Sequence, residues 1–226
     1  AAIVTAGGSS KLTSITESGT ITPITLTAAQ YSTTLVGKFA NFTANITGVS
    51  AANASTISTN AKVSSLTVSD TATNITTNLA ALKTIVSGGK LTAITETGTI
   101  SNLTLTAAQY DPNFTAKFTN FFAVVSAVTA STVASITLDS KVASFTVSDT
   151  AANISLKIAD LITASTKLTS ITETGTIAAI ALTAAQYSTT LTAKFSNFTA
   201  TVSGVAAATA TSVLTNTKVT SITVSD

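Results

Sequence analysis

Glutamate recurs in one sequence context of this chain, and a repeated carboxylate is a residue pattern that could do chemistry. Glu17, Glu96 and Glu173 each lie in the motif ITE[ST]GT. A carboxylate can bind a cation, and two carboxylates a few ångströms apart can act as an acid and a base when their pKa values differ. Because these glutamates lie about one repeat apart in sequence, the spacing favours polar surface or turn capping over catalysis.

Other residue types that build common catalytic and metal sites are missing. The sequence has no His and no Cys, so a serine nucleophile has no imidazole base and a metal has no thiolate or imidazole ligand. Gly7-Gly8 and Gly88-Gly89 lack the spacing of calcium-binding or phosphate-binding loops, and they are interpreted as helix ends. The sequence therefore predicts a protein that is not an enzyme, with no catalytic, cofactor-binding or metal-binding residues and no cofactor.

Charge is sparse and evenly spread. Charged residues make up 9% of the chain, hydrophobic residues 45%, and the formal net charge is +2. All the basic residues are lysines that stand singly along the sequence. This distribution predicts lysines that keep the surface soluble and prevent sheet edges from pairing, and it argues against a nucleic-acid-binding protein. Every long apolar stretch is broken by Thr, Ser or Asn, so no membrane span is predicted. The sequence opens without the basic and apolar regions of a signal peptide, and the absence of Cys and Met suits an oxidising exterior.

The hexapeptide LTAAQY at 26–31, 105–110 and 182–187 reveals an internal repeat. Lys11, Lys90 and Lys167 mark equivalent positions, separated by 79 and then 77 residues. The predicted organisation is a truncated repeat tail at 1–10, repeats at 11–89 and 90–166, and an incomplete repeat at 167–226, all in one continuous solenoid.

Each repeat contains three strand-then-helix turns. In the first turn, Tyr31, Leu35 and Phe39 have helical spacing, as do Tyr110, Phe114 and Phe118 and also Tyr187, Leu191 and Phe195. In the second, Phe42, Ala44 and Ile46 alternate as on a strand before an Ala-rich helix that ends near Ile57. In the third, a strand with Val63, Leu66 and Val68 facing inward precedes a helix with an apolar stripe of Ile75, Leu79, Leu82 and Val86.

Polar residues at the expected helix starts indicate where each strand ends and the next helix begins. The pairs Thr27 with Gln30, Thr106 with Gln109 and Thr183 with Gln186 have the spacing of a capping box, in which two backbone donors gain partners. Asp70 and Asp149 are the predicted N-caps of the third-turn helices, and Ser50 or Thr129 those of the second-turn helices. Ala206 stands at the equivalent position of the third repeat, which predicts a weaker helix there.

Strand-helix turns of this length predict an α/β solenoid in which parallel strands stack into one sheet, like leucine-rich repeats. The pattern V-x-x-L-x-V in KVSSLTV is similar to the strand of such repeats, although Asp stands where their Asn is expected. The alternatives are tandem β-sandwich modules, which leave the helix stripes unexplained, and a parallel β-helix.

The composition, VSDTAANI and LTAAQY together resemble the repeat arrays of very large secreted bacterial surface proteins, of the adhesin and S-layer kind. The resemblance implies an extracellular scaffold built from many copies. Both ends of the sequence cut through a repeat, which predicts either a fragment of a longer array or a subunit that stacks head to tail with identical subunits.

The predicted function is that of a structural module of a secreted extracellular filament, surface layer or adhesin at the cell surface, acting by stacking and spacing. The alternative is a module that binds carbohydrate or ice through a Thr-rich sheet face. A covalently attached glycan is a further possible partner, because sequons occur at Asn41, Asn45, Asn53, Asn74, Asn102, Asn113, Asn153 and Asn197.

Overall fold

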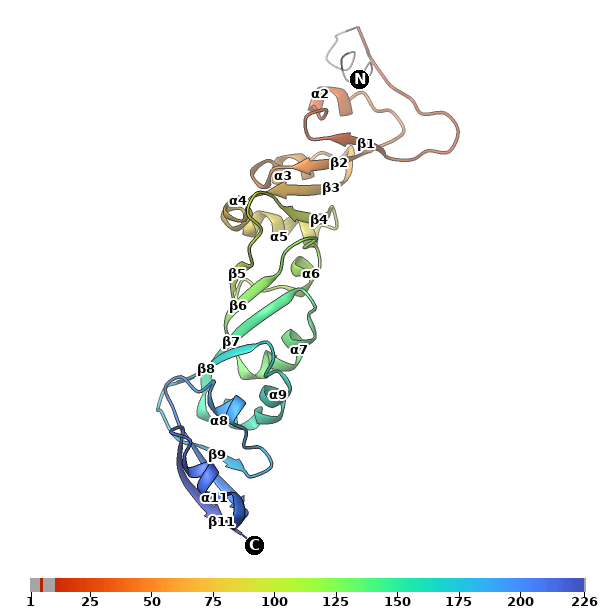
Figure 1. Ribbon diagram of the computed structural model, residues 1–226. Helices are drawn as coiled ribbons and strands as arrows, with labels where there is room; N and C mark the ends of the chain where they lie inside the picture. Colours follow the sequence, from red (N-terminus) through yellow and green to blue (C-terminus); the bar gives the residue numbers. More distant parts are fainter. Residues whose placement is uncertain (1–4, 6–10, 226) are drawn as a thin grey trace. The chain divides into compact units, whose positions relative to one another are not determined.

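Short strands and short helices follow one another along the chain in the computed structural model, which describes residues 5 and 11–225 (Figure 1). The strands are β1 (Ile24–Thr27), β2 (Ala44–Val49), β3 (Val63–Asp70), β4 (Leu91–Glu96), β5 (Leu103–Thr106), β6 (Ala123–Val128), β7 (Val142–Thr150), β8 (Leu168–Thr174), β9 (Ile180–Thr183), β10 (Ala200–Val205) and β11 (Val219–Val224). The helices are α2 (Thr33–Val36), α3 (Ala51–Ser58), α4 (Ala72–Thr77), α5 (Leu79–Ser87), α6 (Pro112–Thr115), η1 (Ala130–Thr132), α7 (Val133–Leu138), α8 (Ala151–Leu156), α9 (Ile158–Thr163), α10 (Thr189–Thr192) and α11 (Ala207–Leu214).

In the described part of the chain the strands form three open sheets, so the prediction of a single sheet is wrong. Their orders are β1-β2-β3-β4, β5-β6-β7-β8 and β11-β10-β9. Pairing is parallel, as between β2 and β3 or between β7 and β8. Within each sheet the strands pair in parallel and a helical segment lies between successive strands, which confirms the expected α/β class and does not fit tandem antiparallel sandwiches.

The chain divides into two compact units. One comprises Ala1–Leu103 and Asp111–Phe122, and the other comprises Thr104–Tyr110 and Ala123–Asp226. The repeat predicted at 90–166 contributes residues to both. Within each unit, we call a strand together with the helical segment that follows it a coil.

The interior of each coil is made by the apolar residues that the sequence pattern identified. Val63, Leu66 and Val68 of β3 are buried, and so are Ile75, Leu79, Leu82 and Val86 of the following helical segment. This segment is divided into α4 and α5 at Asn78, so two short helices carry the stripe instead of one. Gly88 ends α5 and Gly89 adopts φ +75°, which confirms the predicted helix stop, whereas Gly7-Gly8 lies outside the described residues.

The first-turn helix predicted from the Tyr-Leu-Phe spacing is wrong beyond a single turn. Helix α2 spans Thr33–Val36, and Phe39 instead forms a parallel β-bridge with Ile15. The same holds in the other repeats, where Phe118 bridges Ile94 and Phe195 bridges Ile171. The spacing misled because the tertiary environment outweighs periodicity over so few residues. Each phenylalanine stacks on an aromatic neighbour three residues later, with ring centroids 4.3 Å apart for Phe39 and Phe42.

A residue with positive φ interrupts the middle strand of each repeat. Gly48, Ala127 and Gly204 have φ of 68°, 56° and 70°, and the strand register shifts at each of them. Ala127 is the single non-glycine residue with positive φ in the described part of the chain. An L-residue with a Cβ is strained in this conformation, by roughly 1–2 kcal/mol.

We therefore expect Ala127→Gly to stabilise the protein. The relief of strain exceeds the extra entropy that glycine loses on folding, which leaves a net gain of about 0.5–1 kcal/mol. Chemical denaturation of the variant should show a higher midpoint with an unchanged slope. Gly48→Ala is the reciprocal control: an added Cβ would meet nothing within 4 Å, so strain alone should destabilise that variant. A lower midpoint for Ala127→Gly would contradict this account of the bulge.

Candidate functional site

Each LTAAQY segment forms a strand end and a turn. The Thr27 amide donates to Gln30 Oε1 at 2.9 Å, and the Gln30 amide donates to Thr27 Oγ1 at 3.3 Å. Thr106 and Gln109 make the same reciprocal pair, while in the third repeat the Thr183 amide donates to Gln186 Oε1. The predicted capping-box hydrogen bonds are thus present in the first two repeats. They close a turn rather than a helix start.

Helix starts downstream of these turns are capped by other residues. Ser32 Oγ accepts from the Leu35 amide at α2, and Ser188 Oγ accepts from the Leu191 amide at α10. Asp111 has this role at α6, where Pro112 occupies the first helical position. The structural joint predicted for LTAAQY therefore extends to the residue after Tyr.

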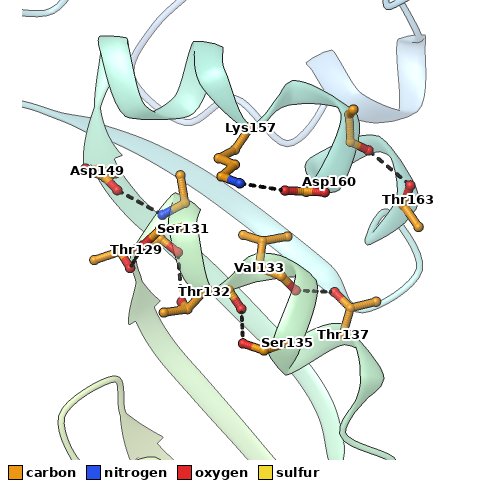
Figure 2. Close-up of polar contacts among 12 residues, drawn as sticks. Thr129, Ser131, Thr132, Val133, Ser135, Thr137, Asp149, Lys157, Asp160 and Thr163 are labelled. Carbon is orange, nitrogen blue, oxygen red and sulfur yellow. Dashed lines mark hydrogen bonds and ion pairs between the residues drawn. The ribbon is translucent and has the colours of Figure 1, made fainter.

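Asp70 and Asp149 tie neighbouring coils together. Asp149 Oδ2 accepts from the Ala130 amide at 2.9 Å, at the start of the previous coil's η1. Figure 2 draws this bond as a dashed line from the labelled Asp149. Its Oδ1 accepts from the Thr150 amide at 2.8 Å and the Asn153 side-chain amide at 2.7 Å. Asp70 makes the equivalent bonds, with Ala51 at the start of α3.

The predicted capping roles are therefore corrected. The N-caps of α4 and α8 are Thr71 and Thr150, whose hydroxyls accept from Asn74 and Asn153. Ser50 and Thr129 stand at helix starts but make no side-chain capping bond. Ala206, the residue before α11, therefore lacks no capping bond that its counterparts Ser50 and Thr129 make. The prediction of a weaker helix at α11 rested on such a bond and is not supported. Sequence spacing could not reveal a cap that comes from 19 residues further along the chain.

Hydrogen bonding sets the protonation of these aspartates. Desolvation raises the pKa of Asp149, but the bonds from the Asn153 side chain and from the Ala130 and Thr150 amides outweigh it and hold the pKa below its ordinary value. The pKa of Asp70 is lowered in the same way. Both carboxylates therefore stay ionised and remain fixed acceptors at neutral pH.

Two of the three recurring glutamates are buried, so the prediction that they form polar surface is wrong for those two. Glu96 and Glu173 are each 2% exposed, whereas Glu17 is partly exposed. The turn-capping alternative fits the contacts: Glu96 Oε1 accepts from the Ser101 amide at 3.0 Å, and Glu173 Oε1 accepts from the Ala178 amide at 3.1 Å. The carboxylates thereby close the loops that follow β4 and β8.

Each buried glutamate also has an acidic neighbour that the sequence analysis missed. Asp70 pairs in register with Glu96, and Asp149 pairs with Glu173, on adjacent parallel strands. Residues paired in this way share one face of a sheet. Glu96 Oε2 and Glu173 Oε2 are buried without a hydrogen-bond partner among the described residues. Each of these oxygens is a local cost in stability, since its desolvation is not compensated.

An asparagine clamps the backbone of each glutamate. Asn120 Oδ1 accepts from the Glu96 amide at 2.9 Å, and Asn120 Nδ2 donates to the Glu96 carbonyl at 2.8 Å. Asn41 and Glu17 form the same pair, as do Asn197 and Glu173. The side-chain amide thus supplies both hydrogen bonds that a neighbouring strand would supply.

Several lysines have a structural role beyond solubility. Lys90 Nζ donates to the Ser58 and Asn60 carbonyls at 2.7 and 3.0 Å, beside the end of α3. Lys167 Nζ binds the Thr137 and Asp139 carbonyls beside the end of α7. A cation is favourable at a helix C-terminus, where carbonyls lack partners. The same helices therefore receive an aspartate at one end and a lysine at the other from later coils.

A cavity lies beside the first LTAAQY turn. It has a volume of about 490 Å³ and is lined by Ala28, Tyr31, Gly48, Val49, Ser50, Asn53, Thr56 and Ile57. A second cavity of about 300 Å³ lies at largely equivalent residues of the third repeat and is lined by Ala184, Tyr187, Val202, Val205, Thr209, Ser212 and Val213. Neither lining contains a charged side chain. The sequence analysis had placed a binding face on the sheet and did not identify these cavities.

Seven of the eight sequons fall into two structural groups. The eighth, Asn45, is partly buried, and its Oδ1 accepts from the Ser64 and Ser65 hydroxyls at 2.7 Å. Asn41, Asn74, Asn153 and Asn197 use their Nδ2 atoms as hydrogen-bond donors, so attachment of a glycan would compete with structure. The side chains of Asn53, Asn102 and Asn113 are exposed.

Among residues 5 and 11–225, no group of three or more His, Cys, Asp or Glu side chains could hold a metal ion, and no helix is long and apolar enough to cross a membrane. Lys157 and Asp160 form a surface ion pair at 3.3 Å (Figure 2), of a kind that contributes little. No family model, curated protein or solved structure matches the chain.

Proposed function

We propose that this chain is a structural repeat module of a secreted extracellular filament, surface layer or adhesin, and that it acts by stacking and spacing. The coils would continue one another in a leucine-rich-repeat-like solenoid. The observation that carries the proposal is the set of bonds between coils, in which Asp70 and Lys90 reach the two ends of α3 from later coils. Asp149 and Lys167 repeat this arrangement around η1 and α7.

Such bonds suit a spacer, because each coil supplies what the previous coil lacks. Stability is then distributed over neighbouring units, and adding a repeat adds length without a new kind of interface. The paucity of conventional catalytic side chains fits the same role. The resemblance to secreted bacterial surface arrays supports an extracellular location, with neighbouring repeats or identical subunits as partners.

Duplicating one repeat tests the spacing function. We expect a chain with a second copy of residues 90–166 inserted after residue 166 to fold cooperatively and to have a larger maximum dimension in small-angle X-ray scattering. An insertion that unfolds, or that leaves the maximum dimension unchanged, would contradict the spacer function. A copy inserted after residue 150, within the coil, is the control and should disrupt folding.

Antibody labelling of native cells tests the location. We expect labelling of intact cells at the level seen after lysis, and imaging of the labelled material should show a fibre or a lattice. Labelling that requires lysis would contradict an extracellular role.

A further inference from the structure

We propose that the cavity beside Tyr31 is a binding site for a neutral saccharide. This inference goes beyond the spacing function and does not depend on it. The cavity lies between the first LTAAQY turn, the end of β2 and one face of α3. Its volume of about 490 Å³ falls within the usual range of small-molecule sites.

The polar side chains at the cavity are available to a ligand. Ser50, Asn53 and Thr56 make no side-chain hydrogen bond within the described part of the chain. Asn53 and Thr56 are exposed and Ser50 is partly exposed. Together they offer two hydroxyl groups and one amide, which can both donate and accept.

The apolar part of the lining complements these groups. Val49 and Ile57 are buried, and Tyr31 lies partly exposed beside them. The Tyr31 hydroxyl is fixed by the Asn60 side-chain amide, which donates to it at 3.3 Å. An aromatic ring held in place offers a large apolar surface at little cost in side-chain entropy.

These properties select the class of ligand. Because no charged residue lines the cavity, a phosphate, a carboxylate or an amine would find no opposite charge there to replace its hydration. A purely apolar ligand would cover Ser50, Asn53 and Thr56 without pairing them, which is unfavourable. A sugar ring combines C–H surfaces with hydroxyl groups and satisfies both parts of the lining.

The equivalent cavity of the third repeat provides an internal comparison. There the Thr209 hydroxyl donates to the Ala206 carbonyl at 3.1 Å, and the Ser212 hydroxyl donates to the Thr209 carbonyl at 2.7 Å. These polar groups already have partners within the helix, and the cavity is smaller at about 300 Å³. We therefore expect the first-repeat cavity to bind sugars more tightly than the third-repeat cavity.

Amide chemical shifts of the full, unglycosylated chain test the proposal. The probes are glucose, galactose, mannose and N-acetylglucosamine at millimolar concentrations, with glucose 6-phosphate as a charged probe and benzyl alcohol as an apolar one. At least one neutral sugar should shift the amides of Gly48, Ser50 and Asn53 in a saturable manner, and more strongly than the charged probe. Absence of saturable shifts with all four neutral sugars would overturn the proposal.

Matched variants separate a saccharide site from an apolar cavity. Thr56→Val keeps the side-chain shape but removes a hydroxyl, so it should weaken sugar binding about fivefold. Ser212→Ala removes a hydroxyl that is already bonded within α11, and it should leave binding at the first cavity unchanged. Binding of benzyl alcohol that exceeds sugar binding and survives in Thr56→Val would show an apolar cavity and overturn the proposal. Circular dichroism of each variant establishes that it is folded.

Discussion

Replacing Asp149 with alanine should lower the free energy of unfolding by about 3 kcal/mol, because three charge-assisted hydrogen bonds are lost at a buried position. The loss affects two coils, since the Ala130 amide belongs to the previous coil. Asp149→Asn keeps the shape but presents an amide donor to backbone donors, and we expect it to lose about 2 kcal/mol. Urea denaturation with a constant slope measures both variants. A change below about 1 kcal/mol for Asp149→Ala would contradict the role of this carboxylate.

The pH dependence of the same variant follows from the lowered pKa of Asp149. A carboxylate with a lower pKa in the folded state contributes its full stabilisation above the pKa of the unfolded chain, about 3.9. That contribution is lost as the pH falls through this value and then through the lower folded-state pKa. The stability difference between wild type and Asp149→Ala should therefore be constant near neutral pH and shrink on acidification below about pH 4. A difference that grows on acidification would have the wrong sign.

Replacing Asn120 with alanine should destabilise the protein by about 2 kcal/mol. The variant leaves the Glu96 amide and carbonyl without the two bonds that the Asn120 side chain supplies. Asn120→Asp should be worse at neutral pH, because it removes the donor and adds a charge next to the buried Glu96.

Asn102→Ala is the matched control, since Asn102 is exposed and makes no side-chain hydrogen bond in the described part of the chain. We expect that variant to unfold within about 0.5 kcal/mol of wild type. Equal stability of the Asn102 and Asn120 variants would show that the clamp contributes nothing.

The features that follow from local periodicity were predictable from the sequence. The apolar residues Val63, Leu66 and Val68 identified a buried strand, although a register irregularity makes the step from Val63 to Leu66 three residues. The spacing of Ile75, Leu79 and Leu82 identified a helix face. The helix stripe extends over enough residues to show a period of 3.6, whereas the strand was recognised from its β-branched and apolar residues next to that stripe. The repeat itself followed from the recurrence of LTAAQY.

The one-turn helices were not predictable in the same way. Tyr31, Leu35 and Phe39 have helical spacing, but Phe39 pairs with Ile15 and stacks on Phe42. A stretch this short fits either structure, so contacts with distant residues decide between them.

The bonds between coils escaped sequence reasoning for a different reason. Capping rules assign an aspartate to the helix that follows it, and on that basis Asp70 was assigned to α4. Its Oδ2 atom instead accepts a hydrogen bond from the Ala51 amide at the start of α3, in the previous coil. The register that places Asp70 next to Glu96 is likewise set by strand pairing and is not apparent from the separation of the two residues in sequence. The cavity beside Tyr31 depends in the same way on how the turn meets α3.

Amide hydrogen exchange in Asp70→Ala tests most directly the claim that later coils cap earlier ones. The Ala51 amide donates to Asp70 Oδ2 at 2.9 Å, while the Ala130 amide donates to Asp149 and serves as the internal control. We predict that exchange at Ala51 accelerates about tenfold or more in the variant, while exchange at Ala130 is unchanged. Unchanged protection at Ala51, with protection lost instead at the amides of α4, would contradict the account and restore Asp70 to its own helix.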